Sequence, residues 1–152
     1  MSRQGSWEDA RGFTLVEVLV VIILMAIVFG IASSTWFSVV EGRRVDSATN
    51  QLAADLRQAH SKATNRLAPQ TVTMASGSSE YTMTGVANPI DLDDEGAEDL
   101  VEVNTASTIV FNANGSATIT GANPITVESS RDSTNNHTIT VNAATSRVQI
   151  VP

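Results

Sequence analysis

One carboxylate, Glu17, lies near the start of an apolar run at residues 13–32, which reads FTLVEVLVVIILMAIVFGIA. A carboxylate inside an apolar helix costs a few kcal/mol at the centre of a bilayer and less near its interface, so such side chains are usually retained for a partner. If cleavage exposed an amine on Phe13, that amine and Glu17 would pair between neighbouring subunits. Their charges would cancel inside an apolar bundle, and the pair would fix axial register.

A second group of carboxylates lies between residues 91 and 102, where seven acidic residues occur. Some have the spacing of EF-hand ligands, and carboxylate oxygens suit Ca²⁺. The candidate ligands are Asp91, Asp93, Glu95 and Glu102. Against such a site, Glu98 stands where an EF-hand loop has an apolar residue, and Pro89 precludes a regular helix just before it. A solvated, self-repelling acidic loop is the alternative interpretation.

Neither histidine, His60 or His137, belongs to a catalytic motif. The sequence has no Gly-x-Ser-x-Gly nucleophile elbow and no HExxH zinc motif. A Ser-His-Asp enzyme would also need an oriented base and an oxyanion hole. Cysteine is absent, which excludes disulfides, thiolate metal sites and cysteine nucleophiles. We therefore predict a protein that is not an enzyme and has no cofactor other than the possible Ca²⁺.

The sequence predicts one long helix, which carries Glu17 near its start. Twenty helical residues span roughly 30 Å, the thickness of a bilayer core, and residues 13–32 are longer than the apolar part of a secretory signal. Beyond residue 38, apolar residues recur at spacings of three or four, which predicts one apolar face of an amphipathic helix. That face contains Val45, Ala48, Leu52, Leu56, Ala59, Ala63 and Leu67. Pro69 predicts the end of the helix near residue 67.

Beyond the helix, short alternating segments predict an antiparallel sheet. Asn114-Gly115 is a strong turn signal between two of them. The predicted strands are residues 70–75, 80–84, 105–112, 116–120, 125–128, 137–142 and 147–151. The predicted fold class is α+β, with a long N-terminal helix, membrane-spanning in its first half, packed against a C-terminal antiparallel β-sheet head.

The segment Arg11-Gly12-Phe13-Thr14-Leu15-Val16-Glu17 resembles the class III signal of type IV pilins and type II secretion pseudopilins. The resemblance implies cleavage after Gly12, N-methylation of Phe13 and use of Glu17 in assembly. It also implies four regions: a leader at 1–12, a transmembrane and filament-core half-helix at 13–37, an amphipathic half-helix at 38–68 and a β-rich head at 69–152. The implied partners are prepilin peptidase, other pilin or pseudopilin subunits, the inner membrane and assembly platform proteins.

The head is similar to the GspH/FimT group of minor pseudopilins and minor pilins. The similarity lies in residues 108–115, in Ile139-Thr140-Val141 and in the terminal Ser146-Arg147-Val148, where the group usually has Gly in place of Ser146. It implies a minor structural subunit of a pilus or secretion pseudopilus. The expected location is the inner membrane, single-pass with a cytoplasmic N-terminus and a periplasmic or extracytoplasmic head, and then the filament.

The alternative function is that of a minor pilin acting as DNA receptor or tip adhesin in natural transformation. The net charge of −7 and the single lysine, Lys62, disfavour a nucleic-acid partner, because phosphate contacts need Lys and Arg. The C-terminal region offers two arginines, Arg131 and Arg147. A DNA-binding head would be expected to have several arginines close together.

Overall fold

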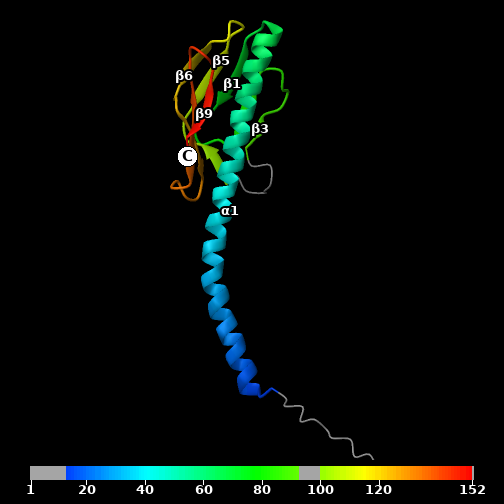
Figure 1. Ribbon diagram of the computed structural model, residues 1–152, viewed down its shortest axis with the longest axis vertical. Helices are drawn as coiled ribbons and strands as arrows, with labels where there is room; N and C mark the ends of the chain where they lie inside the picture. Colours follow the sequence, from blue (N-terminus) through cyan, green and yellow to red (C-terminus); the bar gives the residue numbers. More distant parts are fainter. Residues whose placement is uncertain (1–12, 93–99, 152) are drawn as a thin grey trace, which may run out of the picture. The chain divides into compact units, whose positions relative to one another are not determined.

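The structure is a computed structural model that describes residues 13–92 and 100–151, with the backbone alone at residues 33–38. Within these residues one helix, α1 (Leu15–Arg66), precedes nine strands (Figure 1). The strands are β1 (Gln70–Met74), β2 (Glu80–Met83), β3 (Ile90–Asp91), β4 (Val101–Val103), β5 (Ser107–Phe111), β6 (Ala117–Gly121), β7 (Ile125–Ser129), β8 (Asn136–Val141) and β9 (Val148–Val151). The chain separates into two compact units, residues 1–38 and 39–152, and their boundary falls inside α1.

The first unit contains the apolar part of α1. The window Leu15–Ala32 is long and apolar enough to cross a membrane, with a mean hydropathy of 3.0 and none of it buried. Its large side chains are all at least 46% exposed. An apolar helix that buries none of its faces within its own chain requires a lipid or protein environment, because about 25 cal/mol is gained per Å² of apolar surface removed from water.

The second unit is built from two antiparallel sheets and the remainder of α1. The first sheet has the order β3-β2-β1-β5-β6 and the second the order β4-β7-β8-β9. A single core contains buried residues from both sheets and from α1, including Leu52, Leu56, Phe111, Ile125 and Ile139. Figure 1 shows the strands along the C-terminal half of α1, which supplies the helical side of that core. The predicted α+β class is therefore confirmed.

The helix and the predicted strands agree closely with the structure. The helix ends at Arg66, one residue before the expected position. All seven predicted strands are present. The turn at Asn114-Gly115 is also present, with Gly115 at φ +84°, but its loop has three residues, because the amide of Asn112 donates to the carbonyl of Ser116 at 2.8 Å. Two strands, β3 and β4, were not predicted, and they are two and three residues long.

The predicted apolar face is wrong at one residue, Leu67. Leu67 is 77% exposed, whereas the six preceding members from Val45 to Ala63 are buried. The reason is that the chain leaves the helix at Leu67, which has φ +52°. The amide of Ala68 then donates to the carbonyl of Ala63 at 3.2 Å, the bond that closes a Schellman helix end.

Candidate functional site

The first turn of α1 positions Glu17. The backbone N–H of Glu17 donates to the Thr14 hydroxyl oxygen at 3.2 Å, and the N–H of Val18 donates to the Thr14 carbonyl at 3.2 Å. Thr14 is thus the N-cap residue and Glu17 the third residue of the helix, which are the residue types and positions of a capping box. The positive end of the helix dipole also favours a carboxylate there. The pattern Thr-x-x-Glu before an apolar run is visible in the sequence and is a signal for this helix start.

The surroundings of Glu17 are apolar and open. Between Phe13 and Ala32, all of which the structure describes, Glu17 is the single charged side chain. Phe13 is 79% exposed and Val16 68% exposed. Phe13 and Glu17 therefore both lie on the accessible N-terminal end of the apolar helix. Gly12, the other predicted processing residue, lies outside the described residues.

In the head, a series of contacts joins α1 to the strands. His137 Nε2 lies 2.6 Å from Asp46 Oδ1, and further along α1 the Gln51 side chain donates to the Asp91 carbonyl at 3.1 Å. The remaining contacts, in order along α1, are the Tyr81 hydroxyl with the Asp55 carboxylate, Arg57 with the Val148 carbonyl, and the His60 ring with Phe111. These contacts show which strand residues lie beside which turn of α1.

Tyr81 has the most strongly perturbed environment of this series. It is fully buried, and its hydroxyl donates to Asp55. Burial raises the pKa of the Tyr81 hydroxyl far above its ordinary value, and the Asp55 carboxylate raises it further by favouring the protonated donor. The group therefore stays a neutral donor that ties β2 to α1.

Both histidines contact side chains of the head, His137 with Asp46 and His60 with Phe111. His137 contacts Asp46 through Nε2, while its Nδ1 is buried and has no hydrogen-bond partner among the residues that the structure describes. A catalytic histidine needs one nitrogen facing the reacting group and the other held by an orienting group, and the buried Nδ1 faces neither. His60 packs its ring at 5.9 Å from that of Phe111.

Two of the four candidate calcium ligands, Asp91 and Glu102, lie in the described part of the chain. Asp91 belongs to β3 of the first sheet and Glu102 to β4 of the second, while Asp93 and Glu95 lie outside the described residues. Among the described residues no group of three His, Cys, Asp or Glu side chains could hold a metal ion. The calcium site stays a prediction.

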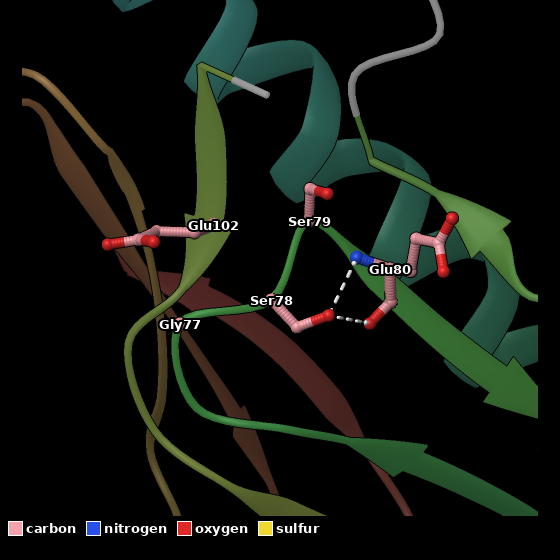
Figure 2. Close-up of a pocket in the computed structure, with 5 residues that line it drawn as sticks. All are labelled: Gly77, Ser78, Ser79, Glu80 and Glu102. Atoms are coloured by element: carbon pink, nitrogen blue, oxygen red, sulfur yellow. Dashed lines mark hydrogen bonds between the residues drawn. The ribbon is translucent and has the colours of Figure 1, made fainter. Parts of the chain in front are cut away.

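A polar pocket of about 300 Å³ lies beside these strands, between the β1–β2 turn and β4. It is lined by Gly77, Ser78, Ser79, Glu80 and Glu102. Figure 2 shows the carboxylates of Glu80 and Glu102 pointing away from each other, and the Ser78 hydroxyl engaged with the backbone of Glu80 at 3.0 and 3.1 Å. The pocket therefore does not bring its two carboxylates together.

The two C-terminal arginines are not clustered. Arg131 lies in the β7–β8 turn and Arg147 in the β8–β9 turn, at opposite ends of β8. Ser146, just before Arg147, has φ +53°, a conformation that glycine adopts most easily. Its hydroxyl donates to the Gly115 carbonyl at 2.8 Å, which compensates for the absence of glycine at this position.

Comparison with known proteins gives two family matches. The model of the prokaryotic N-terminal methylation motif matches residues 9–33, and that of type II transport protein GspH matches residues 48–145. No curated protein matches the chain. A crystal structure of the type IV minor pilin FimU from Pseudomonas aeruginosa PAO1 matches with a TM-score of 0.46 and 15% identity, covering 70% of this chain and 92% of that chain.

The GspH match extends over more than half of the chain and includes every strand from β1 to β8. The methylation motif spans the capped helix start and the apolar window of α1. These families consist of structural subunits, and no finding favours the alternative of a DNA receptor. The chain therefore belongs to the type II transport protein GspH family and is a minor pilin-like structural subunit.

Proposed function

We propose that this subunit is cleaved between Gly12 and Phe13, N-methylated on the new Phe13 amine, and assembled through a pair between that amine and Glu17 of a neighbour. The observation that carries the proposal is a lone carboxylate, Glu17, on an exposed apolar helix inside the N-terminal methylation motif. A methylated amine keeps its positive charge. Its pairing with Glu17 would neutralise both groups among packed helices, where an unpaired charge is costly.

The location and partners follow from the same processing step. The precursor would be a single-pass inner-membrane protein, with its N-terminus in the cytoplasm and its head on the periplasmic or extracytoplasmic side. Prepilin peptidase would remove residues 1–12, and assembly platform proteins would transfer the subunit to the filament. Residues 13–37 would then form the filament core, residues 38–68 the amphipathic half of the helix, and residues 69–152 the head.

Glu17 has a second explanation that the experiment must separate from the first. Glu17 is the third residue of the helix that Thr14 caps, and at that position a carboxylate can also accept from the N-cap amide and so stabilise the start of α1. Loss of such a cap costs about 1 kcal/mol. Removal of one partner from a buried charge pair costs about 3–5 kcal/mol. Because 1.4 kcal/mol corresponds to a tenfold change, the two explanations predict effects that differ by at least an order of magnitude.

Glu17→Gln distinguishes them, because glutamine also serves in a capping box but carries no charge. We expect Glu17→Gln to lower incorporation by about a hundredfold or more, from the pair energy above. Thr14→Ala, which removes the cap and leaves the charge, should lower it about fivefold or less. Incorporation is measured as the fraction of the chain in sheared filaments relative to the membrane, with Gly12→Ala as a variant whose band should remain at precursor size.

The outcomes decide between the roles. Normal incorporation of Glu17→Gln would contradict the charge pair and leave Glu17 as a capping residue. A Gly12→Ala chain of mature size would contradict the cleavage position. Equal defects in Thr14→Ala and Glu17→Gln would contradict the large excess expected for loss of the charge pair, and circular dichroism of the purified chains in detergent would show whether either variant weakens the helix.

A further inference from the structure

The turn between β5 and β6 contains the pair Asn114-Gly115, and Asn-Gly occurs once in the chain. Asn114 is exposed, and its Oδ1 accepts from the backbone N–H of Ser116 at 3.0 Å and from the Ser116 hydroxyl at 2.7 Å. Its Nδ2 has no hydrogen-bond partner among the residues that the structure describes. The side chain of Asn114 is therefore held by its carbonyl oxygen, and its amide nitrogen is open to solvent.

This arrangement is an Asx turn, in which an asparagine side chain bonds to its own backbone two residues on. The small ring of atoms that the bond closes includes Cγ of Asn114 and the backbone nitrogen of Gly115. These two atoms join when an asparagine cyclises to a succinimide. Glycine hinders the closure least, because it has no Cβ, and a Cβ built on Gly115 would meet nothing within 4 Å. The turn therefore has space for the ring.

We propose that Asn114 is a site of spontaneous deamidation through a succinimide. The Gly115 nitrogen loses its proton to hydroxide and forms a bond to Cγ of Asn114, while Nδ2 takes a proton from water and leaves as ammonia. Water then opens the ring at either of its two carbonyls, which gives aspartate or isoaspartate. The reaction exchanges one water for one ammonia, and the formal net charge of the chain changes from −7 to −8. It does not depend on processing or assembly of the subunit.

The two donors on Oδ1 of Asn114 favour the attack. Negative charge develops on this oxygen when the nitrogen bonds to Cγ, and the two Ser116 groups already lie at 3.0 and 2.7 Å from it. Donors at such distances stabilise a developing oxyanion. Asn142 is a comparison within the same chain, because it is exposed and its Oδ1 also accepts from two backbone amides. The residue after it is Ala143, whose Cβ hinders the closure that Gly115 permits.

One hydrogen bond opposes the reaction. The Gly115 N–H donates to the Asn112 carbonyl at 3.1 Å, and this bond must open before the nitrogen attacks. It closes the tip of a hairpin, and segments of this kind lie at the low end of local opening free energies. The reaction therefore proceeds from the opened turn, at a rate that rises with pH because hydroxide removes the amide proton.

Isoaspartate changes the contacts of the turn, because its main chain runs through the side-chain carbon and gains a methylene before Gly115. The Gly115 carbonyl accepts from the Ser146 hydroxyl at 2.8 Å, and the Asn112 amide donates to the Ser116 carbonyl at 2.8 Å. Loss of one such bond lowers the midpoint of thermal unfolding by about 4–6 °C. We therefore expect the isoaspartate form to unfold at a lower temperature than the aspartate form.

Incubation of the purified full-length chain in detergent, at neutral and at mildly alkaline pH, tests the site. Peptide mapping by mass spectrometry follows deamidation at each asparagine, and isoaspartate methyltransferase with a labelled methyl donor detects isoaspartate. Asn114 should convert about tenfold or more faster than Asn142, and faster at the higher pH. Conversion of Asn114 no faster than Asn142, or conversion to aspartate without isoaspartate, would overturn the proposal.

Three variants separate the contributions of the two neighbours of Asn114. Gly115→Ala should lower the Asn114 rate to about that of Asn142. Ser116→Ala removes the hydroxyl donor and should slow conversion about two- to tenfold, whereas Ser116→Thr keeps a hydroxyl and should convert at the original rate. An unchanged rate in Ser116→Ala would refute the role given to the donors. The comparison of Asn114 with Asn142 in the unaltered chain stands even if a substitution disturbs the head.

Discussion

Replacing Leu67 with glycine should stabilise the head, although it removes a large apolar side chain. The left-handed conformation at φ +52° costs leucine about 1–2 kcal/mol. Glycine avoids that cost. It also gives the unfolded chain more conformational freedom, which lowers the gain in folding stability by about 0.5–1 kcal/mol. The backbone bond from Ala68 to Ala63 is available to either residue. Because Leu67 is 77% exposed, little burial is lost. The net gain is about 0.5–1 kcal/mol.

For a head of this size, such a gain raises the midpoint of thermal unfolding by roughly 2–6 °C. The midpoint is measured for the full chain in detergent, from the circular dichroism signal of the strands. Leu67→Ala is the matched control, since alanine keeps the strained backbone and should not raise the midpoint. A midpoint for Leu67→Gly at or below that of Leu67→Ala would refute the reasoning. It would mean that the leucine side chain is stabilising despite its exposure.

Gly121→Ala should destabilise the head by about 2–5 kcal/mol, because a Cβ would lie 2.5 Å from the Ala106 carbonyl oxygen and φ is +103°. Gly115→Ala, with φ +84° and open space, should cost only about 1–2 kcal/mol, and equal midpoints for the two would contradict the steric argument. Tyr81, the single tyrosine, should show no tyrosinate absorbance near its usual pKa of about 10 while the head is folded, because burial and Asp55 raise its pKa; ionisation there in a folded chain would contradict this.

Much of the fold was predictable because its patterns are local. The alternation of Ile139 and Val141, and the turn at Asn114-Gly115, identify strands and a hairpin without tertiary information. β4 was missed because Val101 and Val103 flank Glu102 at the end of an acidic stretch, which favours a solvated loop. Their burial arises from pairing with β7, a contact that is distant in sequence. Short strands of this kind are specified by their partners.

The candidate site was predictable in its parts but not in its arrangement. The processing residues and Glu17 are recognisable because their order along the chain carries the information. The capping role of Thr14 was available in the same residues. By contrast, the exposure of Leu67 is not visible in a helical pattern that continues through it. It depends on where the chain turns left-handed, which the leucine itself disfavours.

The net charge of the whole chain is an incomplete argument about partners. A net charge of −7 disfavours a polyanionic ligand only if the cations are evenly spread. Here the described segment from Arg57 to Ser79 contains cations and no carboxylate, while Glu80, Asp91 and Glu102 lie nearer the start of the head. The positions of the charges along the chain therefore bear on its interactions as well as their total.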